Sequence, residues 1–121
     1  MRRVVVTGMG LLTSIGNDKD TSWNNLIDKK SGIKNINHFD VSNLPAKIAG
    51  YINNNNEEEH YFNEKSLLEP RDINRNDRFI QYGLVAAEMA IEDAGLKNFS
   101  EDDKLRTGVS VGSGIGGLET I

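Results

Sequence analysis

Short apolar runs and longer stretches of helical periodicity alternate along the chain. Residues 3–7 are a continuous, mostly β-branched run, which is typical of a strand buried on both faces of a parallel sheet. Residues 46–52 predict a second, weaker strand that Gly50 interrupts, and residues 107–111 predict a third. The chain is therefore expected to contribute three strands to one sheet.

A first helix is predicted between the first two strands. It should begin at one of three consecutive polar residues and end before Gly32, which follows two lysines. The candidate N-caps are Asp20, Thr21 and Ser22. One face of this helix carries Trp23, Leu26 and Ile27.

The most regular helical pattern covers residues 77–94, and Gly95 is placed to end it. Its apolar face consists of Ile80, Leu84, Ala87, Ile91 and Ala94. Small residues cover much of the remaining surface, so a neighbouring backbone can approach closely. These small residues are Gly83, Ala86, Ala87 and Ala90. The polar residues 100–104 predict a turn before the third strand.

The order of predicted elements is β-α-β-α-β, with connections long enough for crossovers. This alternation indicates an α/β fold with parallel neighbouring strands and helices on the faces of the sheet. A length of 121 residues permits one domain. Residues 53–68 begin with a run of asparagines and glutamates, which buries little apolar area, so we expect a variable polar loop or a helix start there.

Composition narrows the class of protein. Hydrophobic residues make up 37% of the chain and charged residues 26%, which supplies a core and excludes a wholly disordered chain. The net charge of −4 argues against a general binder of nucleic acids or membrane surfaces, because such proteins need excess Lys and Arg. No apolar stretch approaches the ~20 residues that span a bilayer. We expect a cytoplasmic protein with no nucleic acid and no membrane as partner.

Candidate metal ligands and acid–base groups are few. The chain has no cysteine, and therefore no disulfide, thiolate metal site or thiol nucleophile. Glu57 and His60 have the i, i+3 spacing of carboxylate-bridged metal sites, but one such pair is insufficient, and His38 has Asn35 three residues before it. We expect no metal and no cofactor, and we interpret both histidines as loop residues.

Two glycine motifs overlap near the third strand. Residues 112–117 satisfy G-x-G-x-x-G, but a dinucleotide fingerprint belongs in the first βαβ unit, so a tight turn is favoured. Residues 108–112 satisfy G-x-S-x-G, but Ser110 lies inside the predicted strand and no histidine follows it. We interpret Ser110 as a strand serine.

A basic cluster stands at the start of the long helix. Arg71, Arg75 and Arg78 are interleaved with Asp72 and Asp77. Solvated charges are the ordinary interpretation, and a docking patch for an acidic partner is the alternative. Spacing alone does not choose between them.

Six segments, in order, carry a family resemblance: residues 2–10 (RRVVVTGMG), 31–33 (SGI), 47–50 (KIAG), 77–82 (DRFIQY), 92–96 (EDAGL) and 112–118 (GSGIGGL). Together they resemble the start of β-ketoacyl-acyl-carrier-protein synthases, most closely the type II condensing enzymes of fatty acid synthesis. The resemblance covers nearly all 121 residues and is weakest at residues 53–68.

The resemblance implies a thiolase-like fold, built of two similar α/β halves in a five-layered αβαβα body that usually dimerises. Residues 1–121 would then be an incomplete N-terminal domain, part of the first half. The family's nucleophilic cysteine and two catalytic histidines would lie beyond residue 121, and His38 and His60 fall on neither histidine motif. We therefore expect no catalytic residue in this chain and no condensing activity from it alone.

The resemblance also implies partners and binding residues. In the family, a cysteine thiolate takes an acyl group from carrier protein or coenzyme A, and decarboxylation of malonyl carrier protein extends it by two carbons. The implied partners are acyl carrier protein and fatty acyl and malonyl thioesters. Ile115 matches a position that helps line the fatty acyl tunnel. Arg71 and Arg75 match basic positions of the carrier-protein docking site, whereas Asn74 departs from a commonly basic residue.

Simpler interpretations stay open at this point. Ile115 is equally compatible with ordinary core packing, and the arginines with a solvated helix start. The whole chain is compatible with a non-catalytic remnant or carrier-protein-binding module, or with a nucleotide-binding α/β domain built on the glycine turn. A partial parallel sheet should also leave the valines of residues 4–6, Val109 and Val111 without some of their covers, and so expose apolar patches.

Overall fold

The computed structural model describes residues 2–54, 61–96 and 98–117. They belong to two compact units. One comprises residues 11–63 and is called the hairpin unit below; the other comprises residues 1–10 and 64–121 and is called the long-helix unit. Each unit is described by itself.

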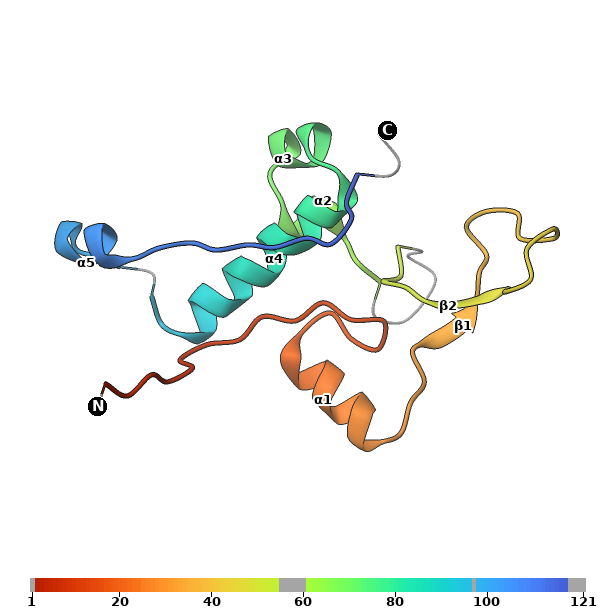
Figure 1. Cartoon of the computed structure of the whole chain (residues 1–121), viewed down its shortest axis with the longest axis horizontal. Helices are drawn as coiled ribbons and strands as arrows, with labels where there is room; N and C mark the ends of the chain where they lie inside the picture. Colours follow the sequence, from red (N-terminus) through yellow and green to blue (C-terminus); the bar gives the residue numbers. More distant parts are fainter. Residues whose placement is uncertain (1, 55–60, 97, 118–121) are drawn as a thin grey trace. The chain divides into compact units, whose positions relative to one another are not determined.

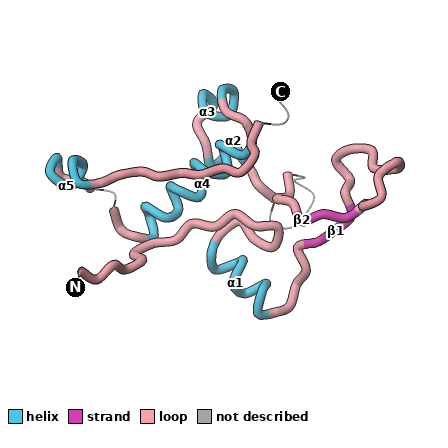
Figure 2. Tube along the Cα trace, in the orientation of Figure 1, coloured by secondary structure: helices cyan, strands magenta, loops and turns pink. Residues whose placement is uncertain are grey.

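In the described part of the hairpin unit, one helix is followed by a two-stranded sheet (Figures 1 and 2). Helix α1 spans Lys19–Ile27, and strands β1 (Ile33–Asn35) and β2 (Ile48–Gly50) pair antiparallel with Lys34 opposite Ala49. The long-helix unit contains α2 (Glu64–Leu67), α3 (Pro70–Arg75), α4 (Arg78–Asp93) and α5 (Glu101–Arg106). Both helices and strands are present, as an α/β chain requires.

Helix α1 begins earlier than predicted because Asp18 supplies the N-cap. The Asp18 carboxylate accepts a hydrogen bond from the Thr21 backbone N–H at 2.7 Å, which satisfies one of the free donors of the first turn. The helix also ends well before Gly32, because Lys29 adopts a left-handed φ of 59° just after the C-cap. The predicted helix is therefore confirmed, with its start and end shifted.

The buried face of α1 is polar. Ser22 and Asn25 are buried, and Asn25 donates a hydrogen bond from Nδ2 to the Ile15 carbonyl at 2.6 Å. The predicted apolar face is exposed instead: Trp23, Leu26 and Ile27 are each 58–61% accessible. Hydrogen bonds to the preceding loop, rather than apolar burial, therefore hold α1 in place within its unit.

Helix α4 confirms the long helical prediction. It follows Asp77 as N-cap, and Gly95 has a φ of 70° just beyond its end, the conformation that favours glycine at this position. Its most buried side chains are Gln81 and Val85, one turn apart. The predicted apolar face stays partly open, since Ile80, Leu84 and Ile91 are 38–41% accessible.

The N-terminal backbone packs directly on the small side chains of α4. A Cβ atom added to Gly8 would lie 2.6 Å from the Ala94 nitrogen, and one added to Gly10 would lie 2.8 Å from the Ala86 carbonyl carbon. The Met9 N–H also donates to the Asp93 carboxylate at 3.0 Å. The predicted close approach of a backbone to this helix is confirmed along the Ala86 side, whereas Gly83 has open space around it.

Gly10→Ala and Gly83→Ala form a matched pair with opposite expected effects. The added methyl group at residue 10 has to displace the α4 backbone, which costs about 1–3 kcal/mol of unfolding free energy. The same methyl group at residue 83 meets no atom within 4 Å and should stabilise the helix by about 0.5–1 kcal/mol. Denaturant midpoints followed by circular dichroism measure both; equal midpoints would contradict the close approach.

The predicted β-α-β-α-β order with parallel strands is not confirmed by this structure. Residues 3–7 and 107–111 form no strand, residues 46–52 shorten to β2, and β1 was not predicted. A strand buried on both faces needs hydrogen-bonded neighbours and covering helices, and the side chains of both segments lie open to solvent. The expected apolar exposure is confirmed: Val4, Val6, Val109 and Val111 are 80–92% accessible.

Residues 100–104, predicted as a turn, begin helix α5. Ser100 and Asp103 form a capping box, in which the Asp103 N–H donates to Ser100 Oγ and the Ser100 N–H donates to Asp103 Oδ2, each at 3.2 Å. The Ser100 hydroxyl donates to the same carboxylate at 2.6 Å. These hydrogen bonds hold the pKa of Asp103 below its ordinary value.

The apolar core is small in both units. Among the described residues, only Phe62 in the hairpin unit and Val85 in the long-helix unit are buried hydrophobic side chains. No helix in the described part of the chain is long and apolar enough to cross a membrane.

Candidate functional site

A cleft of about 240 Å³ lies at the first turn of α4 in the long-helix unit. The segment that follows α5 runs back toward this turn (Figure 1), and its last described residues form the opposite wall. The cleft is lined by Asp77, Arg78, Phe79, Tyr82, Ile115, Gly116 and Gly117. Ile115, the residue singled out from the sequence, therefore lies beside two aromatic side chains.

Glycine at residue 116 permits this cleft to form. A Cβ atom there would lie 2.5 Å from Cε2 of the Phe79 ring, and Gly117 follows with a φ of 73°. The Ile115 side chain is 80% accessible and Phe79 is 38% accessible, so the cleft is open to solvent. Phe79, Tyr82 and Ile115 give it an apolar contact surface, and Asp77 and Arg78 add charged groups to its lining.

Arg78 joins the beginning of α4 to α2. Its Nη1 atom lies 3.5 Å from Glu64 Oε2, and both side chains are roughly one-third accessible. Nη1 is buried and has no hydrogen-bond partner among the described residues. The pair therefore acts as a partly shielded electrostatic contact that orients α2 on the first turn of α4.

Arg71 and Arg75 lie one turn apart on α3, so they share one side of that helix. Both are exposed. Arg71 Nε is 3.6 Å from Asp72 Oδ1, a solvent-exposed pair of small energetic value. Arg75 has no ion pair with any residue in the described ranges. Two guanidinium groups are thus presented to solvent from one short helix.

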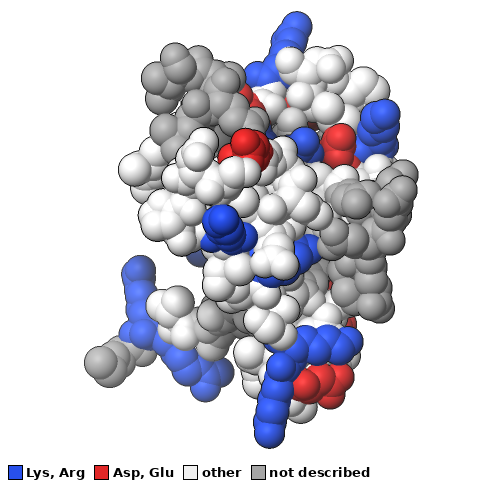
Figure 3. Space-filling view, turned by 90° about the vertical axis from the view of Figure 1, so that its right-hand side faces the viewer, with Lys and Arg blue, Asp and Glu red and all other residues white. Residues whose placement is uncertain are grey.

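The charges on the face drawn in Figure 3 are mixed in sign: Lys and Arg side chains lie at several separate places, with Asp and Glu side chains near some of them. This pattern agrees with the net charge of −4. An acidic partner would therefore be bound through a few local contacts rather than through overall charge.

Gln81 is a site residue that the sequence did not indicate. Its side chain is 6% accessible, and its amide nitrogen donates to the carbonyls of Asn76 at 2.8 Å and Ile73 at 3.2 Å. These carbonyls belong to the last turn and C-cap of α3. The sequence shows only a glutamine within a predicted helix. Its burial depends on α3 folding against α4, which the sequence does not reveal.

The two glycine motifs lie in irregular backbone in the described structure. Gly112 and Gly114 have open space around them, and residues 112–117 form no helix or strand. Ser110 is exposed in a segment without regular structure, so it occupies neither a strand nor a nucleophile elbow.

Of the two histidines, only His38 lies within the described residues. It contacts the rings of Phe39 and Tyr51, with centroids 4.9 and 4.8 Å away. Glu57 and His60, which have i, i+3 spacing in the sequence, lie outside the described residues. Within the described part of the chain, no group of three His, Cys, Asp or Glu side chains could hold a metal ion.

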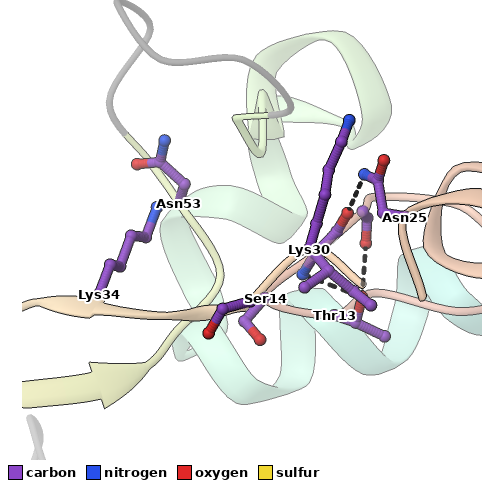
Figure 4. A pocket seen from close by; sticks show the side chains of 9 residues that line it. Thr13, Ser14, Asn25, Lys30, Lys34 and Asn53 are labelled. Atoms are coloured by element: carbon purple, nitrogen blue, oxygen red, sulfur yellow. Dashed lines mark hydrogen bonds between the residues drawn. The ribbon is translucent and has the colours of Figure 1, made fainter. Parts of the chain in front are cut away.

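A second cavity, of about 150 Å³, lies in the hairpin unit and was not predicted. Figure 4 shows Lys34 directed toward Asn53, whereas Lys30 extends away from both. The two ammonium groups therefore do not converge on one point where an anion would be held. The other labelled side chains carry hydroxyl or amide groups. Thr13 is hydrogen-bonded to Ser22, and Asn25 to the Ile15 carbonyl, within the same unit.

Comparison with known proteins matches the chain over its whole length. A family model described as "Beta-ketoacyl synthase, N-terminal domain" matches residues 1–121. The 3-oxoacyl-acyl-carrier-protein synthase 2 of Vibrio cholerae is 44% identical over 120 residues, which are 99% of this chain and 27% of that protein. The proteins of the same name from Rhizobium meliloti and Staphylococcus aureus are each 42% identical, over 100% and 98% of this chain and 29% and 27% of their own lengths.

One similar solved structure is also a ketosynthase. The ishigamide ketosynthase/chain length factor superposes with a TM-score of 0.65 at 31% sequence identity, over 84% of this chain and 23% of that one. The chain thus spans between a quarter and a third of the length of the curated relatives named above.

Proposed function

The chain belongs to the β-ketoacyl synthase family, matching its N-terminal domain, and from this membership we propose that it is the N-terminal part of a fatty-acid-synthesis condensing enzyme. The proposed reaction joins an acyl group to malonyl carrier protein by decarboxylative Claisen condensation. The observation that carries the proposal is the match over residues 1–121. Relatives 42–44% identical that are named 3-oxoacyl-acyl-carrier-protein synthase 2 support it.

The chemistry assigns a supporting role to these residues. A thiolate takes the acyl group from its thioester; loss of CO₂ from the malonyl group then leaves a carbanion, which attacks the acyl carbon and expels the thiolate. Residues 1–121 contain no cysteine. The thiol nucleophile of this reaction must therefore come from outside these residues, which we propose contribute binding and positioning only.

Two binding roles follow from the proposal. Ile115, beside Phe79 and Tyr82 in the apolar cleft, is proposed to contact the fatty acyl chain. Arg71 and Arg75, exposed on one side of α3, are proposed to contact the acidic carrier protein. We further propose that the complete enzyme is a cytoplasmic homodimer.

The complete polypeptide that the gene encodes provides the test of the proposed function. Purified protein is incubated with acyl and malonyl carrier-protein thioesters, and products are identified by mass spectrometry. A 3-oxoacyl thioester two carbons longer than the primer, formed with stoichiometric CO₂, is the expected result. Carrier-protein binding without any such product would instead support a non-catalytic binding module.

Ile115→Phe in the complete polypeptide is expected to shift products toward shorter chains. The larger side chain fills part of the cleft beside Phe79 and Tyr82, and a loss of space for one methylene is worth about 1–3 kcal/mol in discrimination. The ratio of kcat/KM for long and short acyl primers should therefore fall about tenfold. Ile115→Val is the matched control and should leave this ratio within about twofold; an unchanged ratio in Ile115→Phe would assign Ile115 to ordinary packing.

A further inference from the structure

Gln81 connects the last turn of α3 to the buried side of α4. Its amide nitrogen supplies both of its hydrogens, one to the Asn76 carbonyl at 2.8 Å and one to the Ile73 carbonyl at 3.2 Å. Only the amide nitrogen can donate to two carbonyl oxygens, so the orientation of the side chain is determined by its partners. These carbonyls are among those that a helix C-terminus leaves without internal partners.

The helix that Gln81 holds is short and otherwise weakly anchored. Helix α3 spans Pro70–Arg75 and has no buried residue, and its N-cap makes no side-chain hydrogen bond. A helix of this length is not stable by itself in water. Its direction relative to α4 must therefore depend on contacts outside the helix itself, among them the two hydrogen bonds from the buried Gln81 side chain.

The amide oxygen of Gln81 indicates that residue 81 is needed for its N–H donors rather than for packing. The Gln81 Oε1 atom is buried without a hydrogen-bond partner among the described residues. An unpartnered buried acceptor destabilises a fold, and an apolar side chain of the same size would avoid that cost. A position that served packing alone would therefore be better occupied by methionine or leucine.

We propose that Gln81 is a positioning residue of the carrier-protein docking surface: by bonding Ile73 and Asn76, it orients α3 so that Arg71 and Arg75 face the partner together. This inference rests on the proposed function, because it takes the two arginines as the docking groups. Pre-orientation matters there because a flexible α3 would have to be ordered at each encounter, which weakens binding.

Gln81→Met in the complete polypeptide tests the inference, since it retains volume and removes both donor hydrogens. Hydrogen exchange is expected to accelerate at the α3 amides, while α5 is unchanged. The Kd for holo acyl carrier protein is expected to rise about fivefold, and the kinetic effect should appear in KM for carrier-protein thioesters rather than in kcat. Glu88→Met, at an exposed position further along α4, is the matched control and should change neither measurement.

A double-mutant cycle separates positioning from a general structural effect. In an Arg71→Ala, Arg75→Ala background, Gln81→Met should weaken carrier-protein binding no further, because the groups it orients are gone. An additive effect would overturn the inference, as would unchanged α3 exchange, or altered exchange with unchanged Kd. Should Gln81→Met not fold, Gln81→Glu replaces the donors by a carboxylate and is held to the same outcomes.

The two proposals fail in distinguishable ways. If Arg71→Ala and Arg75→Ala bind carrier protein normally, the docking surface is wrong and the inference about Gln81 falls with it. If both arginine variants bind weakly and Gln81→Met binds normally, the docking surface stands and the inference alone is overturned.

Discussion

Residues 1–121 purified by themselves are expected to give no malonyl-dependent elongation of an acyl carrier-protein thioester. Condensation needs a group that accepts the acyl chain covalently, and the chain contains no cysteine. Ser110, the serine within G-x-S-x-G, is exposed and stands in no strand-to-helix turn, so it does not replace the thiol. The expected rate is at least about 10⁴-fold below that of the complete polypeptide.

The measurement is the release of CO₂ from labelled malonyl carrier protein together with mass spectrometry of the products. The complete polypeptide, assayed at equal concentration, is the positive control. Circular dichroism must show helix in the 121-residue chain, so that inactivity is not merely unfolding. Elongation by the 121-residue chain faster than in a reaction without protein would contradict the proposal that these residues hold no reacting group.

The parts of the fold that were predictable from sequence depend mainly on local interactions. Helix α4 has sixteen residues, enough turns for its periodicity and its terminal glycine to indicate both existence and end. Residues 3–7 and 107–111 have strand-like composition, but a strand pairs only where neighbours lie beside it. Composition therefore indicated the strand propensity of these two segments, but not whether they are paired in a sheet.

The short helices were missed for a different reason. Helices α2, α3 and α5 have four to six residues, too few to show a helical period. For α5 a usable signal was present, since Ser100 and Asp103 have the spacing of a capping box ahead of a polar segment. For α3, Pro70 at the first turn was the corresponding mark.

The residues of the candidate site also differ in how far the sequence could predict them. Ile115, Arg71 and Arg75 were reached through family resemblance, and their roles remain proposals. Phe79, which lines the same cleft as Ile115, was not predicted because the cleft joins segments distant in sequence. Gln81 was missed because a single glutamine in a helix is ordinarily solvated, and only the packing of α3 on α4 buries it.

Reversing the charge of both arginines that are proposed to dock the carrier protein should weaken carrier-protein binding more than any other surface change considered above. Arg71 and Arg75 are exposed on one side of α3, and each exposed ion pair is worth about 0.2–1 kcal/mol. Replacing Arg with Glu removes that attraction and adds a comparable repulsion, about 0.4–2 kcal/mol in all, so each substitution should raise Kd about two- to thirtyfold. Arg71→Glu, Arg75→Glu together should approach about 50-fold, because neighbouring charges are not fully additive.

Titration of holo acyl carrier protein against the complete polypeptide, at low and at physiological salt, measures this effect. Most of the loss should lie in the association rate, and the salt dependence of Kd should flatten in the double variant, because salt screens the attraction that has been removed. Arg106→Glu makes the same charge change on α5, where the arginine is also exposed, and should leave Kd within about twofold. Equal weakening by Arg106→Glu would mean that the partner responds to overall charge, and α3 would lose its role as the docking surface.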